Sequence, residues 1–225
     1  MDRTALLLSL RLAGWTTSVL LVLGLPLAWW LARSRWRWKF LVEALVALPL
    51  VLPPTVLGFY LLRAMGPRGV LGPAFEAVSG HPLPFSFTGL VFASVLSSVP
   101  FAVQPFTAAL AGVDPRLLEA AWCLGVSRTR TFLRVVLPLA ATGVVTGLVL
   151  TFAHTLGEFG VVLMVGGNLP GRTRTASLSI YDSVQALDYD AAGSMSLVLL
   201  VVSFLVLALT HGLRRTEASP WTRRS

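Results

Sequence analysis

Charge is what this sequence most lacks. Only 12% of its 225 residues are Asp, Glu, Lys or Arg, while 55% are hydrophobic and the mean hydropathy is +0.77. A soluble domain carries about 25% charged residues. The shortage of charge predicts that lipid surrounds most of this chain.

Residue types that support chemistry are also scarce. Cys123 is the only cysteine, so the chain can form neither an internal disulfide nor a paired-thiol metal site. Lys39 is the only lysine, which excludes the Gly-x-x-x-x-Gly-Lys-Ser/Thr loop that binds ATP phosphates. The histidines are too far apart along the chain for a metal site: His81, His154 and His211. We therefore expect no catalytic residue, no metal and no cofactor in this chain.

Long apolar runs are abundant instead. A helix needs about 20 mostly apolar residues to cross a bilayer. Five stretches qualify, at 14–32, 40–62, 88–110, 135–156 and 191–213. The sequence thus predicts an all-α integral membrane protein with about five transmembrane helices in a single domain, 1–225. A dense basic cluster follows the first run rather than preceding it, so we expect a retained helix and not a signal peptide.

Basic residues divide unevenly between the two sides of this topology. One side holds twelve: Arg33, Arg35, Arg37, Lys39, Arg116, Arg128, Arg130, Arg134, Arg214, Arg215, Arg223 and Arg224. The other side holds six: Arg3, Arg11, Arg63, Arg68, Arg172 and Arg174. Because cytoplasmic loops carry the excess of Lys and Arg, and five crossings place the termini on opposite sides, the N-terminus is predicted outside and the C-terminus in the cytoplasm.

Several predicted crossings are interrupted. Prolines, which remove a backbone donor and favour kinks, lie in the second and third: Pro49, Pro53, Pro54, Pro100 and Pro105. Kinked helices suit a moving pore, although proline is also simply common in membrane helices. In the fourth crossing, Gly143 and Gly147 form a Gly-x-x-x-Gly pattern that permits close helix packing.

The fourth crossing is expected to break near Gly157 and to continue obliquely. The segment GEFGVVLMV is too short to cross by itself, and the residues after it are Gly-rich and polar. Two segments are predicted on the outer side: a loop at 66–84, from its glycine and proline content, and a short surface helix at 177–188.

The stretch LEAAWCLGVSRTRTFLRVVLP, 118–138, has the pattern of two helices joined by a tight turn. Asp114 caps a first helix, with Pro115 at its first position. This helix is predicted to end at about Leu124, with Gly125 as its C-terminal stop and Ser127 as the cap of a second helix.

Two interpretations of this element compete. A DNA-binding helix-turn-helix has a similar pattern, and Arg128, Arg130 and Arg134 offer charges to phosphates. However, the element begins a few residues after the third crossing and runs directly into the fourth, with no linker to reach a duplex. We therefore expect no nucleic-acid partner and interpret the element as a contact for a cytoplasmic protein.

The same residues resemble a known family. The triplet Glu119, Ala120 and Ala121, followed by Gly125 and then by the pair Leu137 and Pro138, is similar to the EAA signature of ABC importer permeases. The resemblance implies the type I importer fold and a cytoplasmic coupling loop at about 111–134 that docks on an ATPase subunit. The implied coupling residues are Asp114, Pro115, Glu119, Ala120, Ala121, Gly125, Ser127, Leu137 and Pro138. ATP and magnesium would then bind to that partner ATPase.

The second half of the chain resembles the permeases of molybdate importers. The segments GEFG, GGN-PG-T-T and IYD-VQ occur in this order within 152–192. Sulfate importer permeases share GEFG and a related GN-P-RT segment. The resemblance implies a multi-pass protein of the bacterial inner membrane with no enzymatic site of its own. Its implied partners are a second copy of the chain, two ATPase subunits and a periplasmic or lipid-anchored molybdate-binding protein.

Polar residues near the expected break are candidates for a translocation path. Thr151, His154, Thr155 and Glu158 fall on one helical face, and ionisable groups within a membrane are functional candidates. His154 and Glu158 equally suit a structural pair, and we expect Glu158 to hold the break rather than to bind a dianion. The full candidate set for the path or the helix break is Thr151, His154, Thr155, Gly157, Glu158 and Gly160.

Arg172 and Arg174 lie on the predicted outer side. They are candidates for attracting the anion or for pairing with acidic residues of a docked binding protein, or they belong to a solvated loop. Transport of sulfate, thiosulfate or tungstate, and a secondary transporter without an ATPase, remain alternative functions.

Overall fold

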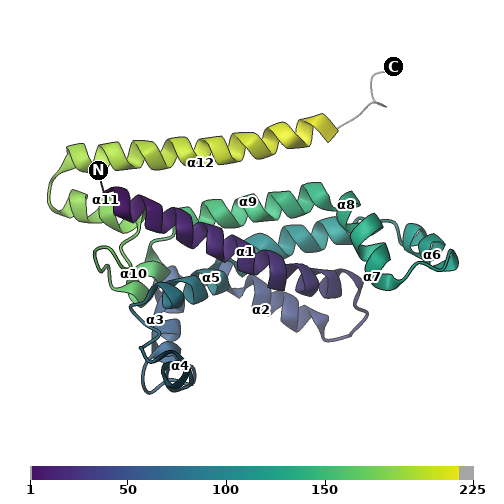
Figure 1. Cartoon of the computed structure of the whole chain (residues 1–225), viewed down its shortest axis with the longest axis horizontal. Helices are drawn as coiled ribbons and strands as arrows, with labels where there is room; N and C mark the ends of the chain where they lie inside the picture. The colour runs from purple at the N-terminus through teal and green to yellow at the C-terminus, as the bar shows by residue number, and fades with distance from the viewer. Residues whose placement is uncertain (1, 218–225) are drawn as a thin grey trace.

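A computed structural model describes residues 2–217 of the chain, with side chains through residue 208, and every regular element in this part is helical (Figure 1). The elements are α1 (Arg3–Arg33), α2 (Lys39–Val51), α3 (Pro54–Met65), α4 (Gly72–Ser79), α5 (Phe87–Ala111), α6 (Pro115–Cys123), α7 (Arg128–Thr131), the π-helical turn η1 (Phe132–Val136), α8 (Leu137–Leu139), α9 (Ala141–Gly157), α10 (Gly160–Gly166), α11 (Ala176–Gln185) and α12 (Tyr189–Glu217). The all-α prediction is confirmed.

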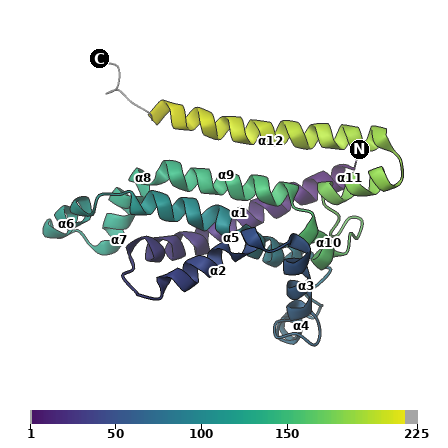
Figure 2. The ribbon, with the colours of Figure 1, turned by 180° about the vertical axis from the view of Figure 1, so that it is seen from behind.

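Three helices, α1, α5 and α9, form the centre of the molecule and run side by side along its long axis (Figures 1 and 2). Their contact faces supply most of the main hydrophobic core, which includes Leu20, Phe106, Leu110 and Val144. Helix α12 lies along the outside and packs on α11 and α9. Its remaining apolar surface, such as Leu200 and Phe204, is exposed, as expected of a helix that faces lipid.

The structure contains three helices that are long and apolar enough to cross a membrane, within the described residues: α1, α5 and α12. Two bent helix pairs raise the number to five if each is one span. The predicted second crossing, 40–62, is one of these pairs: α2 and α3 meet at Leu52 with a bend of 112°. The kink expected from Pro53 and Pro54 is therefore a complete break. Helix α2, at about 1.5 Å per residue, is too short for a crossing by itself.

The predicted fourth crossing, 135–156, is the second bent pair. Residues 128–139 and α9 meet at Ala140 with a bend of 74°, so the crossing is not continuous. Gly143 and Gly147 lie in α9 and face α5, where a Cβ on either would collide with Ala109 or Phe106. The Gly-x-x-x-Gly pattern thus packs two helices of the same chain. The third crossing, by contrast, is one helix, α5, which continues through both of its prolines.

The smaller elements follow the predictions closely. Helix α9 ends at Gly157 and the chain resumes obliquely as α10. The short surface helix is α11, with Leu178 buried on its inner side. The segment 66–84, which was predicted to be an outer loop, contains one helix that was not predicted, α4, which projects sideways from the bundle with α3 (Figure 2).

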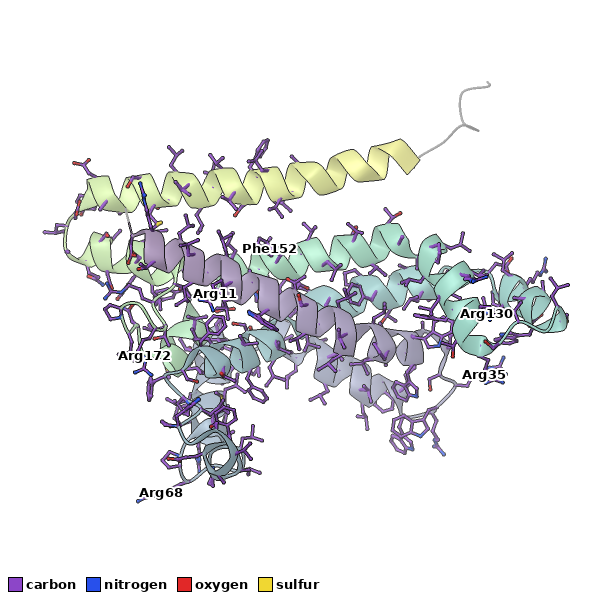
Figure 3. The ribbon with its side chains drawn as sticks, viewed as in Figure 1. Arg11, Arg35, Arg68, Arg130, Phe152 and Arg172 are labelled. Carbon is purple, nitrogen blue, oxygen red and sulfur yellow. The ribbon has the colours of Figure 1, made fainter. Side chains whose placement is uncertain are left out.

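The two predicted groups of basic residues separate in space. Arg35 and Arg130 lie at one end of the molecule, and Arg11, Arg68 and Arg172 lie at the other (Figure 3). Which end faces the cytoplasm stays a prediction. Of the residues assigned to the basic side, Arg223 and Arg224 are outside the described residues, as are the side chains of Arg214 and Arg215.

Candidate functional site

The predicted coupling element begins at α6. Asp114 caps this helix by accepting a hydrogen bond from the Arg116 backbone N–H at 2.9 Å, and Pro115 occupies its first turn. Leu118 and Ala121 are buried, whereas Glu119 and Ala120 are exposed on the opposite face of the helix. The Glu119 carboxylate and the small Ala120 side chain are therefore accessible to a partner, while the buried Leu118 and Ala121 hold α6 against the rest of the chain.

The turn after α6 has the predicted geometry. Gly125 adopts φ +76°, a conformation that costs an L residue about 1–2 kcal/mol, and the Val126 N–H donates to the Ala121 carbonyl at 3.0 Å. Ser127 then caps α7, its hydroxyl accepting from the Arg130 N–H at 3.4 Å. Only four residues, 124–127, separate α6 from α7, and each of these hydrogen bonds fixes the turn between the two helices.

The predicted Leu137–Pro138 pair follows a distortion that the sequence did not reveal. In η1 the Leu137 N–H donates to the Phe132 carbonyl, which is a π-helical pattern. Proline has no N–H, and in a regular α-helix the Pro138 ring would clash with the Arg134 carbonyl. The wider π turn lies directly before Pro138, and such turns are frequent at functional sites.

Arg33, at the end of α1, ties the coupling element to the membrane helices. Its Nη2 atom donates to the carbonyl oxygens of Leu110 at 3.2 Å and Val113 at 2.9 Å, and its guanidinium lies 5.2 Å from the Trp29 ring centroid. These carbonyls belong to the last turn of α5 and to the residues leading into α6. Arg33 therefore connects α1 both to the end of α5 and to the residues that lead into α6.

A hollow of about 350 Å³ lies beside this unit and is lined by Arg33, Glu119, Trp122, Arg128 and Phe132, among others. The Arg128 guanidinium lies 5.5 Å from the Trp122 ring centroid, and Phe132 packs edge-on against Trp29 at 5.1 Å. The hollow offers aromatic walls with two cations and one carboxylate at its margin, which suits a protein side chain.

Glu158 closes the break between α9 and α10. Its backbone is extended, its side chain is 6% exposed, and Oε1 accepts a hydrogen bond from the Val161 N–H at 3.2 Å. The Ser177 hydroxyl donates to the Glu158 carbonyl at 2.7 Å, which ties α11 to the same point. The carboxylate thus satisfies an unpaired donor at the start of α10.

His154 connects Glu158 to α5. Its Nε2 lies 3.6 Å from Glu158 Oε2, and its Nδ1 lies 3.0 Å from the Ser98 hydroxyl. The imidazole stacks on Phe101 with a centroid separation of 4.0 Å. Thr155 also contacts the Ser98 hydroxyl at 3.0 Å. Of the predicted path residues, His154 keeps 25% of its side chain exposed.

Two other residues of that predicted set, Thr151 and Gly160, have packing partners inside the chain. Thr151 is fully buried and its hydroxyl donates to the Gly147 carbonyl at 2.8 Å. Gly160 faces α3, where a Cβ would lie 2.7 Å from Pro54 Cβ, and Gly157 has open space around it. Whether these residues line a path in the assembled transporter stays a prediction.

The two arginines predicted on the outer side, Arg172 and Arg174, have different environments. Arg174 forms an ion pair with Asp182 at 3.1 Å and donates from Nε to Asn168 Oδ1 at 3.0 Å. Asn168 in turn donates to both Asp182 carboxylate oxygens at 2.9 Å. Arg174 thus fixes the loop before α11, whereas Arg172 is exposed (Figure 3).

The sequence did not predict three residues that contact the candidate site residues or the element that carries them: Arg33, Ser98 and Phe101. Arg33 was counted only among the basic residues of one side, and Ser98 and Phe101 belong to a helix other than the one examined for polar periodicity. A buried serine in an apolar helix carries a signal, because its hydroxyl needs a partner. The identity of that partner, 56 residues away, is not encoded in any local pattern.

The fold is that of solved ABC importers. A crystal structure of a bacterial ABC transporter involved in the import of the acidic polysaccharide alginate matches with a TM-score of 0.76 at 18% identity, over 96% of this chain and 79% of that chain. The MetNI methionine ABC transporter, in inward-facing conformations, matches with a TM-score of 0.71 at 17% identity, over 94% of both chains. These matches define the class of fold, that of the membrane-spanning subunits of ABC importers.

The family follows from the sequence comparison. Binding-protein-dependent transport system inner membrane components match residues 24–215, and this chain belongs to that family. Relatives include the molybdenum transport system permease protein ModB of Azotobacter vinelandii, 51% identical over 96% of both chains. The protein of the same name from Escherichia coli K12 is 37% identical over 90% of both chains. The resemblance inferred from the EAA triplet and from 152–192 is confirmed.

Proposed function

We propose that this chain is the transmembrane subunit of an ATP-driven importer that carries molybdate from an external binding protein into the cytoplasm of a bacterial cell. The observation that carries the proposal is the 51% identity to a molybdenum permease over 96% of both chains. The alignment extends through the predicted coupling element and the segment 152–192. The proposed location is the inner membrane.

The complete transporter is proposed to contain two copies of this chain, two ATPase subunits and one binding protein. The need for a separate ATPase follows from the absence of a phosphate-binding loop. Docking of a binding protein has a precedent in the fold, since the alginate transporter has been solved in complex with an alginate pentasaccharide-bound periplasmic protein. That structure is a precedent for the architecture and not for the substrate.

Coupling is proposed to pass through α6. When the ATPases close, α6 and α7 move as one unit, because the positive φ of Gly125 and the cap made by Ser127 fix the short turn between them. Arg33 transmits this movement to α1 and α5. The outer and inner sites are then linked through one two-state element, so a docked binding protein should favour ATPase closure as much as closure favours docking.

The path is proposed to pass a dianion without trapping it. Near the α9 break the partly exposed imidazole of His154 can replace water around an oxyanion, while the buried Ser98 and Thr155 hydroxyls hold this region from within. Glu158 would repel a dianion, but its carboxylate faces the Val161 N–H and His154. Its position supports a role in holding the break.

Co-purification with the ATPase tests the proposal. We expect wild-type chain to retain the ATPase in detergent, and a Glu119→Lys, Gly125→Asp double variant to lose it while still inserting into the membrane. Arg68→Gln, at the opposite end of the molecule (Figure 3), is the matched control and should retain the ATPase. Wild-type chain that binds no ATPase would favour an ATP-independent secondary transporter.

Uptake in proteoliposomes tests the substrate. With the ATPase, binding protein and ATP present, radiolabelled molybdate should accumulate, and excess sulfate should compete weakly. Stronger competition by sulfate or tungstate than by unlabelled molybdate would reassign the substrate within the same transporter class.

A further inference from the structure

A hollow of about 460 Å³ opens at the end of the molecule that holds Arg11, Arg68 and Arg172. Three segments far apart in the sequence build it: α1, the loop before α5 with the start of α5, and the loop after α10. Its walls include Arg11, His81, Ser86, Phe87, Thr88 and Arg172. This hollow is separate from the predicted coupling element, which lies at the other end (Figure 3).

The hollow is basic, and its two arginines have no acidic partner. No Asp or Glu is among its lining residues, and neither Arg11 nor Arg172 forms an ion pair within the described part of the chain. The Arg11 guanidinium lies 5.3 Å from the Phe87 ring centroid, which orients it without neutralising it. Arg174, only two residues from Arg172, is by contrast paired with Asp182. The start of α5 adds the partial positive charge of a helix N-terminus.

We propose that this hollow receives an acidic side chain of the docked binding protein, with Arg11 and Arg172 as the two charges that pair with its carboxylate. This inference rests on the proposed function and adds the partner's chemistry and Arg11. We name the hollow, with these two arginines, the docking socket.

Size and solvation favour a protein carboxylate over a free ion. A tetrahedral oxyanion has five heavy atoms and fills roughly the space of two or three waters, at about 30 Å³ each, so it would leave most of the socket to water. Exposed guanidinium groups in water attract a lone ion only weakly. A docked protein fills the socket, displaces this water and strengthens the same charge pair.

Binding of the molybdate-loaded binding protein to the permease–ATPase complex in nanodiscs tests the socket. We expect Arg11→Gln and Arg172→Gln each to raise the Kd, and the double variant to raise it by roughly tenfold at low salt. The difference from wild type should shrink as NaCl is added. The concentration of binding protein that gives half-maximal stimulation of ATP hydrolysis should rise in the same order, from wild type through the single variants to the double variant.

Arg68→Gln is the matched control, because Arg68 is an exposed arginine at the same end but outside the socket. Its Kd should equal that of wild type. An equal loss in Arg68→Gln would mean that the general positive field, and not the socket, attracts the partner. An unchanged Kd in the Arg11→Gln, Arg172→Gln variant would overturn the proposal.

A further arm distinguishes the source of the anion. Molybdate alone, titrated into the complex without binding protein, should show no binding that depends on Arg11 and Arg172. If it does, the socket holds a free ion and the docking proposal is wrong. Wild-type chain that binds neither the ATPase nor the binding protein would contradict the proposed function itself. Normal docking by the wild type with an unchanged Kd in the variants would contradict the socket only.

Discussion

Glu158 shows how one side chain can define a break in a membrane helix. Its carboxylate accepts from the Val161 N–H at 3.2 Å and lies 3.6 Å from His154, so it serves the end of α9 and the start of α10 at once. In lipid, a backbone N–H without a partner is more costly than in water. These contacts favour a role for the glutamate as a structural anchor of the helix break over a role in binding the anion.

Replacing this carboxylate should destabilise the chain. Glu158→Ala leaves the Val161 N–H without an acceptor, at a cost of about 1–3 kcal/mol, and should lower the thermal midpoint measured by fluorescence-detected size-exclusion chromatography. Glu158→Gln keeps an oxygen for Val161 and should lose less. Glu76→Ala, on the exposed side of α4, should behave as wild type. A midpoint for Glu158→Ala equal to that of wild type would contradict the anchoring role.

At the scale of elements, α3 and α10 approach each other through two glycines. A Cβ on Gly58 would lie 2.7 Å from Met164 Cβ, and a Cβ on Gly160 would lie 2.7 Å from Pro54 Cβ. Both distances are shorter than van der Waals contact. The bend of 112° between α2 and α3 therefore places α3 where only glycine allows α10 to pack.

Larger side chains at these glycines should separate α3 from α10. Overpacking typically costs about 1–3 kcal/mol, so we expect Gly58→Leu and Gly160→Val to lower the thermal midpoint and to reduce molybdate uptake. Gly14→Ala is the control, since nothing lies within 4 Å of a Cβ there. Normal midpoints and uptake in both variants would show that α3 and α10 are not packed this tightly in the membrane.

Arg33 acts between elements, because it joins α1 to the end of α5. Arg33→Gln should leave the ATPase bound but weaken the connection between α6 and the membrane helices. We expect molybdate uptake per ATP hydrolysed to fall by at least about fivefold. This factor corresponds to about 1 kcal/mol, the lower end of typical coupling free energies. Arg37→Gln removes an exposed charge from the same side and should preserve the ratio. Loss of ATPase binding by Arg33→Gln alone would make it a docking residue instead.

The elements also show which features the sequence can predict. The limits of α6 were predictable because Asp114, Gly125 and Ser127 act on their own neighbours, through caps and a positive φ. The prolines indicated a kink after α2 but carried no information on its angle. The Arg33 and Ser98 contacts join residues 77 and 56 positions from their partners, and hydrophobic periodicity does not encode such pairings.

At the scale of the whole molecule, the separation of basic residues predicts the orientation in the membrane. Arg35 and Arg130 represent the richer group, and they lie at the end that carries α6 and α7 (Figure 3). The positive-inside rule predicts that this end lies in the cytoplasm, where an ATPase is available. In that orientation the docking socket would face outward, where a binding protein is available. Orientation, coupling and docking therefore depend on one another, and a single test of orientation bears on all three.

Cys123 makes that test direct, because it is the only cysteine of the chain and is exposed on α6. In spheroplasts that express the chain without its ATPase, a membrane-impermeant maleimide should leave Cys123 unlabelled, whereas inverted vesicles should be labelled. A Cys123→Ser, Arg68→Cys variant should show the reverse pattern, since Arg68 lies at the opposite end. Labelling of wild-type chain in intact spheroplasts would place α6 outside, out of reach of any ATPase, and the coupling role would fail with it.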